Sequence, residues 1–284
     1  MIPAAFDYVR AKSVAEALKA VGKDSKFIAG GHSLLPLLKL RLAQPGRLID
    51  IGHLSQLKGI KAAGSGLRIG AGTTYRELLE SKLLRDRYPL IAEVTERIGD
   101  LQVRNVGTIG GGLAHADPAA DMPPVMLVLD ATFVLQSKGG KRSVPARKFF
   151  RGPFATVLKP NELLTEIRLP ALPRGAGTAY VSFDQAASGY ALVGAAAVVA
   201  LAKAKLSRAE LAFTGLADTP FLATLPRLVG TAHDGAGDMI TEVAGAAVAG
   251  VEPNEDIHAS AEYRIHLAQL AARRALAGAL ARAT

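Results

Sequence analysis

The first 52 residues alternate between apolar side chains at helical spacing and short unbroken apolar runs. Ser13 and Glu16 have the spacing of a capping box before one apolar stripe, and Gly22 supplies its stop. The expected elements are a helix over 14–21, a strand at 27–29, a helix from 34 and a strand at 48–51. This order predicts a small βαβ unit that ends near residue 52.

Apolar spacing predicts a second group of elements up to residue 173. Thr74 and Glu77 form another capping box, for a helix that carries Leu78 and Leu79. The other expected elements are strands at 67–71, 125–129, 132–135 and 164–169 and a helix at 90–97. Residues 99–124 are rich in glycine and proline and show little periodicity, which is typical of a loop that is either functional or disordered.

Residues 170–177 have the composition of a linker and mark the preferred boundary. Beyond it, strands are expected at 179–183, 192–201 and 209–214, followed only by helices, which is typical of an α+β lobe. In the last helix, Tyr263, Leu267 and Leu270 predict a stripe that faces the core. The predicted units are 1–52, 53–173 and 174–284.

The chain of 284 residues has no cysteine, which excludes a disulfide framework, a thiolate nucleophile, Cys-ligated zinc and an iron–sulfur cluster held by this chain. The longest apolar run, Tyr190–Ala202, is shorter than the roughly 20 residues that span a membrane. The first residues lack the pattern of a signal peptide. We therefore expect a cytoplasmic protein without a transmembrane segment, with peripheral membrane contact left open.

The formal net charge is +9, from 34 Lys plus Arg and 25 Asp plus Glu. These basic residues are scattered among acidic ones, without a basic tract or interleaved aromatic residues, so we expect no nucleic-acid partner. A generally basic surface, or a patch for an acidic partner or a phosphate cofactor, accounts better for the charge.

Two glycine-rich segments carry the candidate chemistry. In the first, 26–35, an apolar strand leads into Gly30 and Gly31, and a helix begins near Ser33. Residues without Cβ let a backbone approach a ligand closely, and a helix start directs free N–H groups outward. The turn is therefore a candidate cradle for a phosphate, although alone it also fits an ordinary strand-to-helix turn.

The second segment, 107–121, contains three successive glycines. Thr108 adds a hydroxyl, and Asp121 offers a carboxylate that can accept hydrogen bonds from a ribose or an amide edge. Two such segments, about 75 residues apart, favour one dinucleotide whose phosphates use both.

Other chemistries are disfavoured by spacing. The chain has no G-x-x-x-x-G-K-[ST], and neither glycine cluster satisfies G-x-G-x-x-G. Ser33 lacks the glycine two residues later that a nucleophile elbow requires. His115, Asp117 and Asp121 lack a helical metal-ligand spacing, so no metal ligand is assigned. Tyr190 opens an apolar strand and fits either the edge of the core or a ring packed against a planar cofactor.

Three longer motifs go beyond these generic turns. They are AGGHSL at 29–34, IGDLQVRNVGTIGG at 98–111 and ADPAADMPP at 116–124. With them the chain resembles the FAD-binding medium subunits of molybdenum hydroxylases, in particular the aerobic carbon monoxide dehydrogenase type. The resemblance continues through 161–170 into the Tyr190 segment and so covers essentially the whole chain.

The resemblance implies a vanillyl-alcohol-oxidase-type fold, in which two α/β subdomains enclose a non-covalent FAD and a C-terminal α+β lobe closes over its isoalloxazine. The residues implied at the pyrophosphate and ribityl portion are Lys26, Ala29, Gly30, Gly31, His32, Ser33 and Leu34. Those implied in the second clamp are Thr108, Gly111 and Gly112, with support from Asp121 and with His115 as a further candidate. Those implied near the flavin or adenine rings are Ile98, Leu164 and Tyr190.

Gly112 departs from the family's pattern, in which Asn or Ser commonly follows the paired glycines. The loss of one side-chain hydrogen bond, worth about 0.5 to 1.5 kcal/mol net, predicts weaker FAD binding at an unchanged place.

The resemblance also implies the role of an oxidoreductase subunit. A large subunit would carry the molybdenum cofactor and a small one two two-iron two-sulfur clusters, in a dimer of heterotrimers. FAD would pass electrons from the nearer cluster to a quinone, NAD or oxygen, and this chain would supply no catalytic acid or base. Two alternatives stay open: a stand-alone flavoprotein oxidase, for which about 110 residues after the linker are few, and a non-catalytic FAD-binding assembly module.

Overall fold

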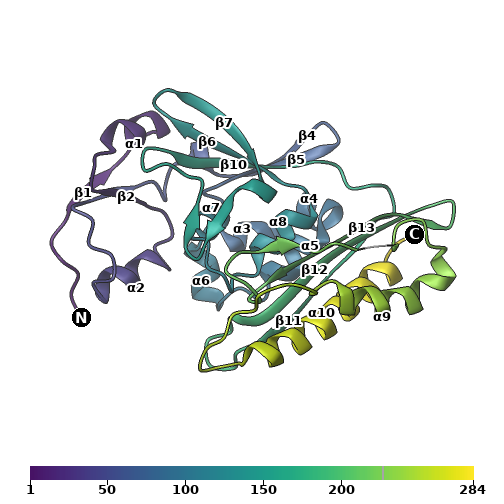
Figure 1. Ribbon diagram of the computed structural model, residues 1–284. Coiled ribbons are helices and arrows are strands. Elements are labelled where there is room, and N and C mark those ends of the chain that lie inside the picture. Colours follow the sequence, from purple (N-terminus) through teal and green to yellow (C-terminus); the bar gives the residue numbers. More distant parts are fainter. Residues whose placement is uncertain (226) are drawn as a thin grey trace.

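The computed structural model describes residues 1–225 and 227–284, in which three main β-sheets are joined by helices (Figure 1). The N-terminal sheet lies at one end of the molecule, drawn in purple. A larger sheet and a group of short helices occupy the middle. The third sheet and the long helix α10 (Ala261–Ala281) form the C-terminal part, drawn in green and yellow.

The N-terminal sheet is parallel, with the strand order β1-β3-β2. Its elements are β1 (Asp7–Arg10), α1 (Val14–Ala20), β2 (Ser25–Ile28), α2 (Leu34–Lys39) and β3 (Arg47–Asp50). Ser13 caps α1 by accepting a hydrogen bond from the Glu16 N–H, whereas the Glu16 carboxylate accepts one from the Lys12 N–H. The predicted βαβ unit is confirmed, and β1 is a further strand whose mostly exposed side chains show no apolar pattern.

The second sheet is antiparallel, with the strand order β4-β5-β10-β6-β7. Its strands are β4 (Ile60–Ala63), β5 (Gly66–Gly70), β6 (Thr132–Ser137), β7 (Gly140–Pro145) and β10 (Leu163–Leu169), and a small hairpin contains β8 (Phe150–Gly152) and β9 (Ala155–Thr156). The helices of this part are α3 (Tyr75–Glu80), α4 (Lys82–Arg87), α5 (Pro89–Thr95), α6 (Leu101–Val106), α7 (Ile109–His115) and α8 (Met122–Val128). The predicted capping box of Thr74 and Glu77 is formed in both directions.

Residues 99–128 differ most from the prediction. The expected loop at 99–124 is largely helical, because it forms α6, α7 and the start of α8, and the expected strand at 125–129 is wrong because α8 continues to Val128. Every residue of α8 is buried, so its apolar side chains show no helical periodicity. Pro123 and Pro124 lie in its first turn, where a missing N–H breaks no helical hydrogen bond.

The third sheet is antiparallel, with the strand order β11-β12-β13-β14. Its elements are β11 (Gly177–Asp184), β12 (Ala191–Ala202), β13 (Lys205–Thr214) and β14 (Phe221–Leu222), followed by α9 (Ala236–Ala246) and α10. The three predicted strands are confirmed, and β14 corrects the expectation that only helices follow them. The predicted stripe of α10 is wrong at Tyr263, which is 50% exposed, while Leu267 is buried against the sheet.

Strand β12 is covered on both faces. Val193, Ala195, Ala197 and Val199 pack in the core beneath α9 and α10, whereas Ala196 and Val198 pack in the core shared with α8. Side chains alternate between the faces of a strand, so two covered faces require apolar residues at successive positions. This explains the long apolar run in the sequence and joins the C-terminal lobe to the middle of the molecule. Within the described residues, no helix combines the length and the apolar character needed to cross a bilayer.

Candidate functional site

The two glycine segments meet between the first and second sheets. A Cβ atom on Gly30 would lie 2.3 Å from the Val106 carbonyl oxygen and 2.8 Å from the Gly107 Cα. Gly31 has a φ of +74°, in the left-handed region that favours glycine. The first segment therefore requires glycine at both positions, one for the close approach of two backbones and one for the turn.

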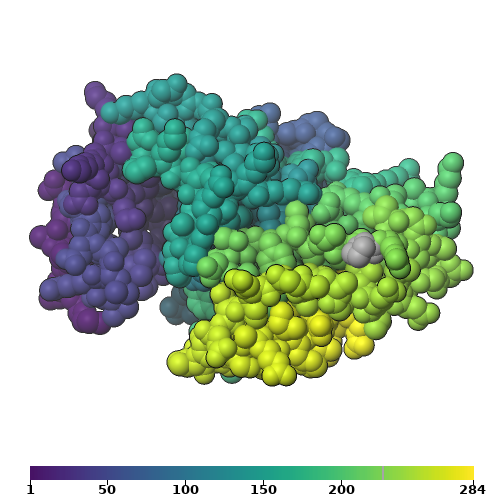
Figure 2. All heavy atoms as spheres, viewed as in Figure 1, coloured from purple at the N-terminus to yellow at the C-terminus, as the bar shows by residue number. Residues whose placement is uncertain are grey.

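A cavity of about 300 Å³ opens beside this contact, and we call it the cradle cavity. Both glycine segments line it, through Ala29 and Gly30 on one side and Thr108 on the other. In Figure 2 the surface is hollowed between the purple N-terminal residues and the teal residues of the second part. His53 and Lys58, whose side chains can donate hydrogen bonds to an anionic ligand, also line the cavity, together with the acidic Asp50.

Backbone hydrogen bonds fix the second glycine segment. The Tyr75 N–H donates to the Gly107 carbonyl (3.0 Å) and the Gly110 N–H donates to the Ala71 carbonyl (2.8 Å). The Thr108 hydroxyl then caps α7 by accepting from the Gly111 N–H at 3.2 Å. The segment is thereby held as a helix start that runs alongside residues 71–75.

The remaining residues predicted around the first turn lie there, mostly at the surface. Lys26 is exposed on β2, and the exposed His32 has its Nδ1 3.1 Å from the Gly30 carbonyl oxygen. Ser33 occupies the cap position of α2 without a side-chain cap hydrogen bond, and Leu34 is the first residue of the helix. Their contacts with FAD stay predictions.

The residues predicted near the rings are spread more widely. Ile98 packs, half-buried, against the core of the second part. Leu164 is 4% exposed within β10, among the apolar side chains of that core. Tyr190, by contrast, is 48% exposed and stands directly before β12. Tyr190 is therefore accessible at the surface, and the roles of all three residues stay predictions.

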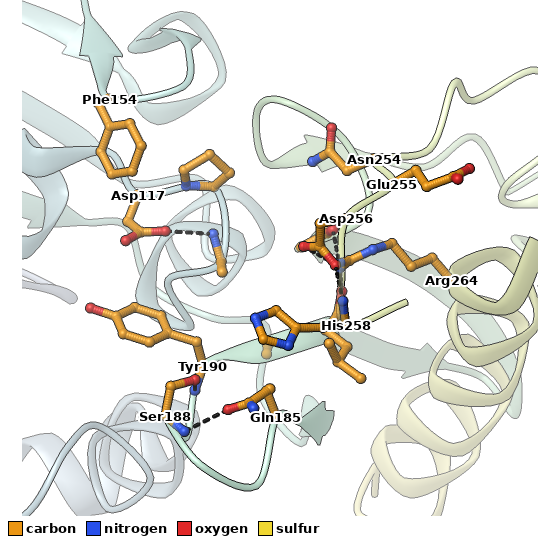
Figure 3. Close-up of a pocket in the computed structure, with 15 residues that line it drawn as sticks. Asp117, Phe154, Gln185, Ser188, Tyr190, Asn254, Glu255, Asp256, His258 and Arg264 are labelled. Carbon is orange, nitrogen blue, oxygen red and sulfur yellow. Dashed lines mark hydrogen bonds and ion pairs between the residues drawn. The ribbon is translucent and has the colours of Figure 1, made fainter. Parts of the chain in front are cut away.

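Tyr190 lies at a second cavity, of about 390 Å³, which we call the Tyr190 cavity (Figure 3). Asp117 and Phe154 line it from the middle of the molecule, and Asp256 and His258 line it from the C-terminal lobe. Burial raises the pKa of the Tyr190 phenol, and the negative charge of Asp117 raises it further. Tyr190 is therefore a neutral aromatic side chain between the two parts of the chain.

His115 ends α7 close to the same region. Its ring centroid lies 5.1 Å from that of Phe154. Burial lowers the pKa of His115, Asp117 raises it and Lys26 lowers it. Within the described residues, no group of three or more His, Cys, Asp or Glu side chains is arranged to hold a metal ion.

Asp121 connects the second glycine segment to the C-terminal lobe. The Tyr180 hydroxyl of β11 donates a hydrogen bond to Asp121 Oδ1 at 2.5 Å. Burial raises the pKa of Asp121 to about 6, although the Tyr180 hydrogen bond opposes this change. Asp184 adds to the increase. The carboxylate thus has one oxygen engaged within the protein before any cofactor binds.

This raised pKa predicts that Asp121 opposes folding at neutral pH in the flavin-free protein. The folded state binds the Asp121 proton more tightly than the unfolded state does, so protonation of this carboxyl stabilises the folded chain. This stabilisation is fully present below about pH 3.8 and is lost as the pH rises to about 6. Relative to Asp121→Asn, the unfolding free energy of the unaltered chain should fall by about 3 kcal/mol across this window. Urea unfolding at several pH values measures the difference.

Tyr180→Phe provides the matched control, because it removes the hydrogen bond that lowers the pKa of Asp121. The upper end of the window should then move to higher pH, while the lower end, which is set by the unfolded chain, stays near pH 3.8. If the difference in unfolding free energy between the unaltered chain and Asp121→Asn does not change with pH, the pKa of Asp121 is not raised in the folded state.

Two residues of the site were missed by the sequence analysis. Tyr75, the first residue of α3, places its hydroxyl beside Gly112, where an added Cβ would lie 2.3 Å from the oxygen. Arg264 of α10 is 4% exposed and lines the Tyr190 cavity. A tyrosine among apolar residues and an arginine in a long helix are ordinary in a sequence, and neither lies within a motif.

Two known protein families match this chain, one over each part. A family model described as the FAD binding domain in molybdopterin dehydrogenase matches residues 4–172. A second, the CO dehydrogenase flavoprotein C-terminal domain, matches residues 178–279. The chain belongs to the family of FAD-binding medium subunits of molybdenum hydroxylases. This medium subunit is an oxidoreductase subunit with FAD as its cofactor, and the predicted fold class is confirmed, with an antiparallel sheet in its second part.

Relatives match this medium subunit over nearly its whole length. The carbon monoxide dehydrogenase medium chain of Hydrogenophaga pseudoflava is 42% identical, with 99% of each chain covered. The glyceraldehyde dehydrogenase medium chain of Sulfolobus acidocaldarius is 40% identical, covering 93% of this chain and 94% of that one. Among solved structures, carbon monoxide dehydrogenase from H. pseudoflava has a TM-score of 0.95 with both chains fully covered. Quinoline 2-oxidoreductase from Pseudomonas putida 86 has a TM-score of 0.93 at 32% identity, with 99% of each chain covered.

The observed residues of this medium subunit fit FAD. Gly30 and Gly31 carry no side chains where the backbone of the first glycine segment approaches that of the second. Polar groups line the cradle cavity beside this turn. The Tyr75 hydroxyl lies beside Gly112, and no hydrogen bond joins it to a described residue. A dinucleotide provides both anionic and polar groups for such a lining.

Proposed function

We propose that this medium subunit transfers electrons from an iron–sulfur partner subunit to an external acceptor, which is a quinone, NAD or oxygen. When bound, FAD supplies the redox chemistry. The observation that carries the proposal is that two glycine segments, far apart in the sequence, meet at one polar cavity. The chain binds and orients the cofactor, and Tyr190 offers it an aromatic face.

We assign FAD binding to the residues around both glycine segments and at the ring positions. These residues are Lys26, Ala29, Gly30, Gly31, His32, Ser33, Leu34, Ile98, Thr108, Gly111, Gly112, His115, Asp121, Leu164 and Tyr190. The proposed units are 1–52 and 53–173, which enclose FAD, and 174–284, which closes over it. The separate sheets of the three parts support this division.

We further place the molybdenum cofactor and the two-iron two-sulfur clusters in partner subunits. A chain without cysteine supports that division, because iron–sulfur clusters are held by thiolates. The relatives are named for different substrates, carbon monoxide and glyceraldehyde among them, which supports substrate choice outside the medium subunit. The proposed assembly is a cytoplasmic dimer of heterotrimers.

Anaerobic stopped-flow spectroscopy of the complete complex tests this function. After the iron–sulfur clusters are reduced, we expect rapid bleaching of the flavin and its return when an acceptor is added. The complex with a flavin-free medium subunit should reduce the acceptor at least about tenfold more slowly. Turnover of an organic substrate by the medium subunit alone would support an oxidase instead, and a flavin that is not reduced in the complex would support an assembly module.

A further inference from the structure

The Tyr75 ring lies against the second glycine segment. Its backbone is fixed by the cap at Thr74 and by the hydrogen bond from its N–H to the Gly107 carbonyl. A Cβ atom on Gly107 would lie 3.2 Å from the ring, and one on Gly112 would lie 2.3 Å from the hydroxyl oxygen. The side chain therefore runs under the segment and brings its hydroxyl out at Gly112.

The side chain of Tyr75 is buried as a whole, whereas its hydroxyl oxygen is not fully enclosed by protein atoms. Tyr75 is 6% exposed, and no hydrogen bond joins its oxygen to a described residue. Burial raises the pKa of the phenol, and Asp121 and Tyr190 raise it further, so the group is a neutral donor. A hydroxyl that is accessible and makes no hydrogen bond to a described residue is available to a ligand that supplies the acceptor.

The position of the hydroxyl also explains the glycine at 112. Apart from the backbone of α7 itself, the atoms of the described residues within 4 Å of an added Cβ there are the Tyr75 oxygen, at 2.3 Å, and the ring carbon that carries it, at 3.6 Å. A side chain at 112 and a hydroxyl on residue 75 thus compete for one space.

We propose that the Tyr75 hydroxyl donates to bound FAD the hydrogen bond that a polar side chain at position 112 would otherwise make. Tyr75 and Gly112 then form one exchanged pair, and the glycine does not weaken FAD binding. This inference rests on the proposed placement of FAD at the second glycine segment. It corrects the expectation, from Gly112 alone, of reduced affinity.

The test compares four forms of the full chain, purified with its partner subunits, stripped of flavin and titrated with FAD: unaltered, Tyr75→Phe, Gly112→Asn, and the double variant. Flavin fluorescence gives the dissociation constant. Tyr75→Phe should weaken binding about tenfold, through loss of a hydrogen bond. Gly112→Asn should weaken it at least as much, because its Cβ meets the Tyr75 oxygen. The double variant should return to within about threefold of the unaltered chain, because the remaining contact at 3.6 Å is ordinary.

Two controls separate this role from a structural one. Tyr88→Phe removes the hydroxyl of another buried tyrosine, which donates to the Pro170 carbonyl at 2.7 Å, and should leave FAD affinity unchanged. The thermal midpoint of flavin-free Tyr75→Phe should equal or exceed that of the unaltered chain, since an unpaired hydroxyl is removed. The proposal is overturned if Tyr75→Phe binds FAD normally, if the double variant binds no better than Gly112→Asn, or if the flavin-free midpoint of Tyr75→Phe falls. Failure of the unaltered chain to bind FAD would instead contradict the proposed function.

Discussion

Gly30→Val is expected to weaken FAD binding by about 100-fold, equivalent to close to 3 kcal/mol. Any side chain at this position places its Cβ 2.3 Å from the Val106 carbonyl oxygen and 2.8 Å from the Gly107 Cα. Both neighbours are backbone atoms, which cannot rotate away as a flexible side chain can. The two glycine segments must therefore separate, and the cradle cavity between the first two sheets loses its shape. Titration of the flavin-free protein with FAD measures the effect.

Gly22→Ala is the matched control in the same N-terminal part. Among the described residues other than its two chain neighbours, no atom lies within 4 Å of an added Cβ at Gly22, and its φ is outside the left-handed region. This variant should bind FAD as the unaltered chain does. If Gly30→Val binds FAD within about threefold of Gly22→Ala, the convergence of the two segments does not shape the site.

Arg264→Met is expected to lower the free energy of unfolding by about 3 kcal/mol. The Arg264 guanidinium donates to the carbonyls of Leu192 (2.5 Å) and Gly215 (3.1 Å) and to Asp256 Oδ2 (2.6 Å). Methionine fills a similar volume but leaves these two carbonyls and the loop of Asp256 without their donor. Because this loop and the start of β12 both line the Tyr190 cavity, FAD affinity should fall as well. Urea unfolding gives the change in stability.

Arg273→Met removes the same charge from an exposed position of the same helix. Its unfolding free energy should stay within about 0.5 kcal/mol of the unaltered chain. Equal effects of the two substitutions would show that general charge, and not the buried contacts of Arg264, determines the stability of the lobe.

The sequence predicted an element correctly where a local signal determines that element. The cap at Ser13 and the box of Thr74 and Glu77 gave correct helix starts, because a side chain and a backbone N–H three residues apart settle the geometry. The apolar run of β12 was read as a buried strand, and both of its faces are covered. The sequence also predicted that the two glycine segments lie at one site, because two candidate phosphate cradles favour a single dinucleotide.

Where the prediction was wrong, contacts with distant parts of the chain determine the secondary structure. α7 contains three successive glycines, which disfavour a helix by themselves, yet backbone hydrogen bonds to residues 71–75 fix its start. α8 is surrounded by the core and needs no polar face. Tyr75 became visible as a site residue only when the fold brought it beneath Gly112, 37 positions later in the chain. Local spacing contains no information on such a contact.

The flavin content of the complete complex tests the central claim most directly. We would purify the medium subunit with its partner subunits, denature the complex and quantify the released flavin against the amount of medium subunit. The account predicts one FAD for each medium subunit, released into solution because it is bound non-covalently. A complex that contains all its subunits and the other cofactors, but no FAD even after incubation with excess FAD, would contradict it.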